Sequence, residues 1–247
     1  MRLTRVHPAP PAMMDALEKD FGVEVIHAWG MTEMSPLGTV ARLNSRNRHA
    51  DPETRRRLHL KQGRAVYGVD MMVLDDQQQP LPWDGTTSGN LVVRGPWVID
   101  AYFQQAESPL IEVEGRKWFP TGDVAAIDAD GFMQITDRSK DVIKSGGEWI
   151  SSIDIENIAM AHPAVHEAAA IACRHPKWDE RPLLIVVPKP GASVTRDELL
   201  AFFEGRIAKW QVPDDVIFVT ELPHTATGKL LKLKLREQFK DHLLAAG

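Results

Sequence analysis

The sequence predicts an α/β fold followed by an α+β fold, and three changes of pattern support this. Residues 1–63 combine helical spacing of apolar residues with a short β-like run. Residues 64–137 change to a period of two, with glycine and proline between short runs, which is typical of a β-barrel or sandwich-like subdomain. After Lys140, helical and strand patterns mix over about 100 residues, a usual domain size. We therefore assign residues 1–139 to one domain and residues 140–247 to a second, smaller one.

The first domain is predicted to begin with an irregular, proline-rich segment over residues 1–12. Helical spacing covers residues 13–21, and Gly22 can end that helix. Residues 23–26 indicate a strand that runs into a polar loop over residues 27–33. Because ligands of open α/β sheets bind beyond the carboxyl ends of strands, this loop is a candidate site.

A second helix is predicted to begin with Asp51 as N-cap and Pro52 in the first turn, and to end at Gly63. The strands predicted after it cover residues 65–67, 69–74, 91–93 and 124–127.

In the second domain, Ser151 or Ser152 can cap a helix that continues to Ala161. Thr195 and Glu198 have the spacing of a capping box. A basic helix over residues 230–244 closes the chain. The strands predicted here cover residues 168–173, 183–187 and 216–219.

The composition is that of a globular protein, with 43% hydrophobic and 26% charged residues. The formal net charge of −5 gives no indication of nucleic acid or an anionic membrane as a partner. No apolar run approaches the roughly 20 residues that a transmembrane helix needs. The single cysteine, Cys173, excludes an internal disulfide and favours a reducing compartment, so we expect a cytoplasmic protein. Its apolar neighbours predict a buried, unreactive thiol.

The stretch Trp118–Ile150 concentrates polar chemistry. Asp123 follows a predicted tight Thr-Gly turn, and Arg138 and Lys140 lie between two β-like runs. The pair Gly146–Gly147 allows a ligand to approach the backbone closely. An acid, cations and bare backbone indicate a phosphate-bearing ligand. The alternative is a pair of hairpins with solvated turns, since short motifs also match by chance.

A polar loop with the sequence P-H-T-A-T-G-K leads into the last predicted helix and ends at Lys229. A solvated surface lysine is one interpretation of this residue. The other is a mobile point charge that reaches a phosphate or a carboxylate.

Taken together, five motifs in this order resemble the carboxyl-terminal half of an adenylate-forming acyl-CoA synthetase. They are W-G-M-T-E (29–33), G-N-L-V-V-R-G with A-Y-F (89–103), W-F-P-T-G-D (118–123), D-R-S-K-D-V-I-K-S-G-G-E-W-I (137–150) and P-H-T-A-T-G-K (223–229). The resemblance covers nearly the whole chain. It is strongest to bacterial medium- and long-chain fatty-acyl-CoA ligases, including the methylmercaptopropionyl-CoA ligase branch.

This resemblance implies a remnant of the large adenylating domain followed by a small lid domain. It also implies a two-step reaction on a fatty acid or related carboxylic acid, with ATP, Mg²⁺ and coenzyme A. The carboxylate first attacks the α-phosphate of ATP, which gives an acyl-adenylate and pyrophosphate. The coenzyme A thiol then displaces AMP.

The resemblance also implies how ATP is held. Trp29, followed by Gly30 and Met31, matches the aromatic residue that lies against adenine, a role that suits a flat ring. Thr32 matches the hydroxyl that contacts the α-phosphate. Glu33 matches the carboxylate that binds Mg²⁺, an ion that prefers hard oxygen ligands.

Further roles follow from the same resemblance. Asp123 and Arg138 match the acceptor and the donor for the ribose hydroxyls, and Ile135 belongs to the same nucleotide-binding set. Lys140 matches the hinge about which the small domain rotates. Lys229 matches the catalytic lysine that stabilises the charge developing at the α-phosphate. The segment expected to line the coenzyme A tunnel is Lys144, Ser145, Gly146, Gly147, Glu148 and Trp149.

Two departures from the family pattern are visible. The glycine- and serine-rich phosphate loop is absent, and Asn90 replaces the usual acid of its segment. We therefore expect a truncated ligase with little standalone activity. Two alternatives remain open. One is a non-catalytic fragment that binds a nucleotide or coenzyme A and complements a separate amino-terminal half. The other is a different adenylating activity, as in peptide-synthetase adenylation domains or luciferase-like oxygenases.

Overall fold

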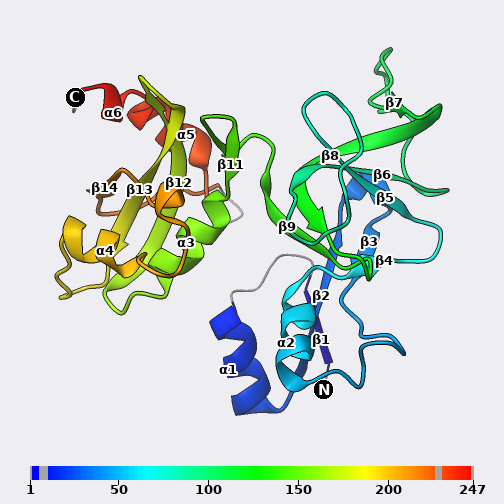
Figure 1. Ribbon diagram of the computed structural model, residues 1–247, viewed down its shortest axis with the longest axis horizontal. Coiled ribbons are helices and arrows are strands. Elements are labelled where there is room, and N and C mark those ends of the chain that lie inside the picture. Colours follow the sequence, from blue (N-terminus) through cyan, green and yellow to red (C-terminus); the bar gives the residue numbers. More distant parts are fainter. Residues whose placement is uncertain (1, 6–10, 226–229, 246–247) are drawn as a thin grey trace. The chain divides into compact units, whose positions relative to one another are not determined.

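The computed structural model describes residues 2–5, 11–225 and 230–245, and the chain divides into two compact units (Figure 1). The N-terminal unit is Met1–Thr136 and the C-terminal unit is Asp137–Gly247. The division falls a few residues before the boundary expected at Lys140. In the described part of the chain, no helix is both long and apolar enough to cross a membrane.

The first sheet of the N-terminal unit has the strand order β1-β2-β3-β4, with β1 parallel to β2 and the other pairs antiparallel. Two helices accompany it, and a three-residue 3₁₀ helix, η1, follows β2. The elements are β1 (Arg2–Arg5), α1 (Pro11–Phe21), β2 (Glu24–Gly30), η1 (Thr32–Met34), β3 (Leu37–Val40), α2 (Pro52–Leu60) and β4 (Arg64–Ala65).

Three predictions for this region need correction. Residues 2–5 form a strand rather than an irregular segment, because they pair in parallel with β2. The strand β2 continues through Gly30, so Trp29 lies in a buried strand and not in a polar loop. The helix α2 begins at the predicted Asp51 cap but ends at Leu60, before Gly63. A Cβ atom at Gly63 would lie 2.1 Å from the Val40 carbonyl carbon, so this glycine allows a close backbone approach instead.

The second sheet of the N-terminal unit has the strand order β5-β6-β8-β7, with β9 paired to β8. Its strands are β5 (Asp70–Leu74), β6 (Gly89–Arg94), β7 (Ile111–Val113), β8 (Arg116–Ile127) and β9 (Met133–Arg138). The predicted Thr121–Gly122 turn is wrong, because β8 continues through these residues as one strand. Between two paired positions β8 advances four residues, from Val124 to Pro120, while its partner β6 advances only two, from Asn90 to Val92. The extra residues form a bulge, in which Gly122 has a φ of +75°.

In the C-terminal unit, apolar clusters cover both faces of the sheet. On β12, Ala168 and Ala170 face the layer that contains α3 and α4, whereas Ala169 and Ile171 face the layer that contains α5. The elements are β10 (Ile143–Ser145), β11 (Glu148–Ile150), α3 (Ser152–Met160), β12 (Val165–His175), β13 (Asp179–Pro188), α4 (Arg196–Phe202), η2 (Lys209–Gln211), β14 (Asp215–Phe218), α5 (Lys232–Phe239) and α6 (His242–Ala245).

The predicted caps of this unit are present. The Ser151 Oγ accepts a hydrogen bond from the Asp154 N–H at 3.1 Å, and Thr195 forms a capping box with Glu198. The predicted closing helix is divided into α5 and α6 instead of being continuous. The division is caused by a contact from another element: the Arg174 N–H on β12 donates a hydrogen bond to the Lys240 carbonyl at 2.8 Å. Cys173 is buried as predicted, and burial raises the pKa of its thiol.

Candidate functional site

Two of the sequence motifs meet in the N-terminal unit through one hydrogen bond. The Trp29 Nε1–H at the end of β2 donates to the Asp123 Oδ2 in the β8 bulge at 2.9 Å, although the residues are 94 positions apart. Trp29 belongs to the first sheet and Asp123 to the second, so the bond joins the two sheets. The W-G-M-T-E and W-F-P-T-G-D motifs therefore lie side by side in the folded unit.

The indole ring of Trp29 is enclosed, with 5% of the residue exposed. It packs in the core cluster that also contains Met34, Val93 and Phe119. A Cβ atom at Gly38 would lie 2.6 Å from the ring, so only glycine fits beside it. The ring face that the resemblance places against adenine is thus mostly covered by this unit itself.

The 3₁₀ helix η1 presents the acidic end of the first motif. Thr32 is exposed and Glu33 half-buried. The Tyr102 hydroxyl donates to the Glu33 Oε1 at 3.0 Å, and the Ile99 N–H donates to the Glu33 carbonyl at 3.0 Å. Desolvation, followed by the hydrogen bond to Glu33, raises the pKa of Tyr102. Tyr102 was not among the predicted site residues, although it belongs to the A-Y-F segment of the second motif.

A magnesium ion would fit the oxygen chemistry of Glu33. Among the described residues, no group of three or more His, Cys, Asp or Glu side chains could hold a metal by itself. In enzymes of this chemistry Mg²⁺ is usually held by one or two carboxylates, water and substrate phosphates rather than by a protein cage.

The remaining predicted nucleotide-binding residues lie on β9, which carries the chain from one unit to the next. The Ile135 N–H donates to the Gln62 Oε1 at 2.6 Å, and its side chain packs against the N-terminal core. The Arg138 N–H donates to the Asp137 Oδ1 at 2.7 Å, and its side chain is exposed. Lys140, the predicted hinge, is also exposed.

The predicted coenzyme A segment forms a β-hairpin in the C-terminal unit. Strands β10 and β11 pair, and the turn between them uses Gly146 and Gly147 at φ values of +60° and +91°. Two consecutive positive φ values are typical of a type I′ turn, which favours glycine. The Lys144 ammonium lies 4.9 Å from the centre of the Trp149 ring, within cation–π range.

A cavity of about 410 Å³ opens beside this hairpin. Trp178 and Trp210 contribute half-exposed indole rings to its wall, at 43% and 45% exposure. The Gly146 N–H donates a hydrogen bond to the Trp178 carbonyl at 2.9 Å, which joins the hairpin turn to the wall of the cavity. The lining residues are Ser145, Gly146, Glu148, Trp178, Arg181, Trp210 and Asp214.

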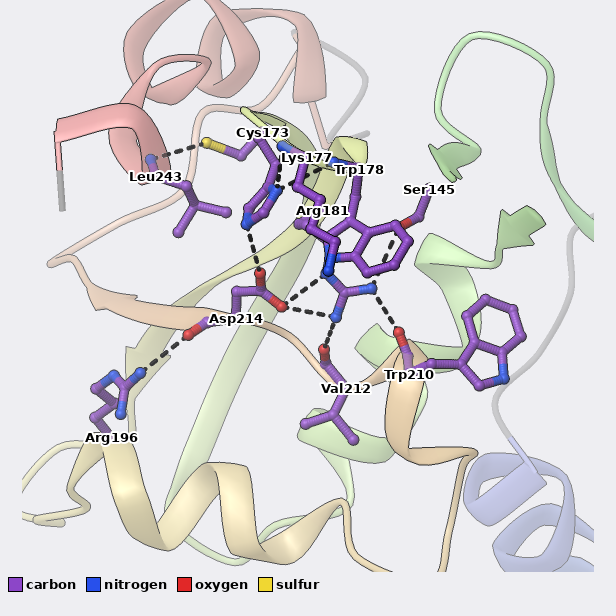
Figure 2. A network of polar contacts seen from close by, with 11 residues as sticks. Ser145, Cys173, Lys177, Trp178, Arg181, Arg196, Trp210, Val212, Asp214 and Leu243 are labelled. Carbon is purple, nitrogen blue, oxygen red and sulfur yellow. Dashed lines mark hydrogen bonds and ion pairs between the residues drawn. The ribbon is translucent and has the colours of Figure 1, made fainter. Parts of the chain in front are cut away.

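Arg181 holds this cavity in shape (Figure 2). Its Nε donates to the Asp214 Oδ1 at 2.8 Å, and its terminal nitrogens reach the Val212 carbonyl at 3.0 Å and the Ser145 Oγ at 3.3 Å. The guanidinium also binds the Trp210 carbonyl. Figure 2 shows these bonds spreading from one central guanidinium. Since these bonds occupy the Arg181 donors, the guanidinium fixes the Trp210 backbone and the cavity wall and is not available to bind a phosphate.

The predicted site residues are divided between the two units. The structure brings Trp29, Thr32, Glu33, Asp123 and Ile135 into the N-terminal unit. It places Arg138, Lys140 and the hairpin from Lys144 to Trp149 in the C-terminal unit. Lys229 lies outside the described residues. The Trp178–Trp210 cavity was not predicted, because its walls come from residues far apart in the sequence.

Two protein-family models match the chain. Residues 3–103 match the AMP-binding enzyme model, and residues 154–229 match the model of the AMP-binding enzyme C-terminal domain. Together the two models cover well over half of the 247 residues.

Curated relatives and solved structures resemble the chain over most of its length. It is 54% identical to a 3-methylmercaptopropionyl-CoA ligase of Ruegeria lacuscaerulensis, over 95% of this chain and 43% of that protein. It is 49% identical to a medium-chain-fatty-acid–CoA ligase of Ectopseudomonas oleovorans, over 98% of this chain and 44% of that protein. Among solved structures, ATP-bound MatB from Rhodopseudomonas palustris matches with a TM-score of 0.79 at 29% identity, over 98% of this chain and 46% of MatB. The chain thus spans less than half the length of these relatives.

Proposed function

The chain belongs to the AMP-binding enzymes, and we propose that it is the carboxyl-terminal part of an ATP-dependent acyl-CoA ligase. In the proposed reaction, a carboxylate oxygen attacks the α-phosphorus of ATP and pyrophosphate leaves. The sulfur of coenzyme A then attacks the acyl carbon of the acyl-adenylate, loses its proton and releases AMP. Relatives named for 3-methylmercaptopropionate and medium-chain fatty acids support a fatty or related carboxylic acid as substrate.

The contact between Trp29 and Asp123 is the observation that carries this proposal. It brings together the two motifs that the family resemblance assigns to the nucleotide. In this account Asp123 accepts hydrogen bonds from the ribose hydroxyls, and Thr32 contacts the α-phosphate. Glu33 supplies an oxygen to Mg²⁺, oriented by the Tyr102 hydroxyl. Carboxylates that are held in place before the ligand arrives bind it at a lower entropic cost.

Ile135 and Arg138 extend the proposed nucleotide site along β9. Ile135 would offer an apolar contact beside the sugar, and the exposed guanidinium of Arg138 would donate to the ribose. Lys140 would serve as the hinge between the adenylation and thioester steps.

We assign coenzyme A to the C-terminal unit. The hairpin Lys144–Trp149 presents glycine backbone at its turn, which allows a narrow pantetheine chain to approach closely. The cavity beside it has two half-exposed indole rings, and flat aromatic faces suit the adenine of coenzyme A. The nearby ammonium of Lys177, 4.5 Å from the Trp178 ring centre, can attract the phosphates.

A second function is a non-catalytic fragment that binds a nucleotide or coenzyme A and complements a separate amino-terminal half. The observation that favours binding without catalysis is the cavity beside Trp178 and Trp210, whose exposed indole rings suit an adenine base. An activity assay with and without such a half separates the two functions.

The test combines this chain with the amino-terminal half of a related medium-chain ligase. We expect pyrophosphate release that depends on the fatty acid, ATP and Mg²⁺ in the mixture, and none from either half alone. Lys229→Ala should then abolish adenylation but preserve thioester formation from a supplied acyl-adenylate, because the lysine charge stabilises only the first transition state. Lys234→Ala, on the exposed face of α5, is the matched control and should change neither step.

Release by the chain alone would contradict the need for a second half. A mixture that binds AMP and coenzyme A but never releases pyrophosphate would favour the non-catalytic function. Equal loss of both steps in Lys229→Ala would contradict the role of that lysine.

A further inference from the structure

The hydrogen bond between Trp29 and Asp123 has a donor that cannot move away. The ring is enclosed by the core, and Gly38 leaves no space on one side of it. A buried indole N–H needs a hydrogen-bond acceptor, since leaving it unpaired costs about 1–3 kcal/mol. Asp123 Oδ2 is that acceptor at 2.9 Å.

The backbone of Asp123 is fixed from a second direction. The Thr121 Oγ1 accepts a hydrogen bond from the Asp123 N–H at 3.1 Å and donates to the Leu91 carbonyl on β6 at 2.8 Å. Gly122, at a φ of +75°, makes the bulge that turns Asp123 toward the end of β2. The main chain therefore fixes where the carboxyl group starts, but not how it is rotated.

The rotation of an aspartate carboxyl group is weakly determined by its own torsion. Its terminal sp³–sp² bond has broad, roughly two-fold preferences rather than three sharp staggered wells. A rigid N–H directed at one oxygen removes this freedom. It also determines where the second carboxylate oxygen points, because the two oxygens share one plane.

We propose that the N–H group of Trp29 makes this residue a positioning residue for Asp123. This inference rests on the proposed function, in which Asp123 accepts the ribose hydroxyls. Trp29 holds the carboxylate in the orientation that meets both hydroxyls of the sugar. The consequence of this hydrogen bond is selectivity for the ribose.

The chain contains a matched control for this N–H group. Trp118 is as buried as Trp29, at 4% exposure against 5%, and it lies on the same strand as Asp123. Its indole N–H, however, has no hydrogen-bond partner among the described residues. Replacing either tryptophan by phenylalanine keeps an aromatic ring in the core and removes one buried N–H. Only at Trp29 does this remove a hydrogen bond.

The experiment measures affinities of the 247-residue chain by calorimetry with two ligands, AMP and a dideoxy-AMP that lacks both ribose hydroxyls. Trp29→Phe should lower the affinity for AMP about tenfold, the equivalent of about 1.4 kcal/mol. The affinity for dideoxy-AMP should stay unchanged. Trp118→Phe should change neither affinity. Asp123→Asn should also lower the affinity for AMP. The double variant Asp123→Asn/Trp29→Phe should lose little further affinity, because both changes act through one contact.

Each other outcome has a defined meaning. An equal loss of affinity for both ligands in Trp29→Phe would overturn the inference, since the loss would then not arise from the ribose hydroxyls. Unchanged AMP affinity in a Trp29→Phe variant that melts like the wild type would also overturn it. If the wild-type chain bound neither ligand, the nucleotide site of the proposed function would be wrong, and the inference would fall with it.

Discussion

The two units each contain a nearly buried lysine–carboxylate pair of the same geometry, yet the surroundings differ. In the N-terminal unit, Lys61 lies 2.6 Å from Asp128, with side-chain exposures of 10% and 20%. In the C-terminal unit, Lys232 lies 2.6 Å from Glu156, with exposures of 11% and 18%. The second pair has a further buried carboxylate nearby, since Asp137 is 1% exposed and interacts electrostatically with Lys232.

The difference shows what each unit depends on. Asp128 also accepts backbone hydrogen bonds from Asp130 and Phe132 at 3.0 and 2.9 Å, so its charge is satisfied in several ways. Glu156 and Asp137 accept backbone hydrogen bonds as well, from Ala170 at 2.9 Å and Ser152 at 2.6 Å, but these two carboxyl groups share one cation, Lys232. Burial raises the pKa of both. The C-terminal unit thus depends on a charge at the start of α5 in addition to its apolar clusters, whereas the N-terminal pair involves a single carboxylate.

The largest expected effect comes from Lys232→Met. It leaves two buried carboxylates without their cation and should destabilise the C-terminal unit by about 3–5 kcal/mol. Lys61→Met is the matched control and should destabilise the N-terminal unit by only about 1–3 kcal/mol, because a single carboxylate loses its cation there. Urea unfolding followed by hydrogen exchange in each unit measures both losses. Equal losses would contradict the comparison, and a Lys232→Met/Glu156→Gln chain should recover part of the stability.

A smaller effect is expected from Gly38→Ala, which tests packing in the N-terminal unit. The added methyl group would meet the Trp29 ring at 2.6 Å and the Met34 methyl at 2.8 Å, so the ring must shift. Overpacking of this kind costs about 1–3 kcal/mol. Gly115→Ala has open space around it but a φ of +70°, so it measures backbone strain without overpacking, whereas Gly38 lies in strand β3 and is not at a positive φ. A stability loss in Gly38→Ala that changed with pH would argue against a packing origin.

The smallest effect is a difference in pH dependence. The raised pKa values of Asp137 and Glu156 mean that their contribution to stability is complete below the unfolded pKa, about 4, and is lost as pH rises through the folded values. Hydrogen bonds from Thr54 and Thr87 instead lower the pKa values of Asp51 and Asp84 in the N-terminal unit. Their contribution is lost only as pH falls below about 4. As pH rises above about 4, hydrogen exchange should show the C-terminal unit losing stability while the stability of the N-terminal unit stays constant. Parallel behaviour of the two units would contradict this.

The elements that the sequence predicts well are those with local causes. The Asp51, Ser151 and Thr195 caps depend on side chains within three residues of the helix start, and all three are present. The continuous β8 and the divided closing helix depend on partners far along the chain. The bulge at Gly122 follows from pairing with β6, and the break after Phe239 from the Arg174 N–H on β12. Local spacing contains neither partner.

The candidate site shows the same limit. The motif residues could be named from their order in the sequence, but the partners that orient them could not. Tyr102 is an aromatic residue in a loop, and only the fold places its hydroxyl on Glu33. The resemblance named Trp29 for its ring, and only the fold shows that the N–H edge of this ring contacts Asp123.

The most direct measurement is an NMR titration of the isotope-labelled chain with AMP. The account holds that W-G-M-T-E and W-F-P-T-G-D form one nucleotide site in the N-terminal unit. It predicts that the signals of Trp29, Thr32, Glu33 and Asp123 shift together, with one common affinity, and that the hairpin Lys144–Trp149 responds to coenzyme A instead. Shifts that spare Asp123, or two motifs that respond with different affinities, would contradict it.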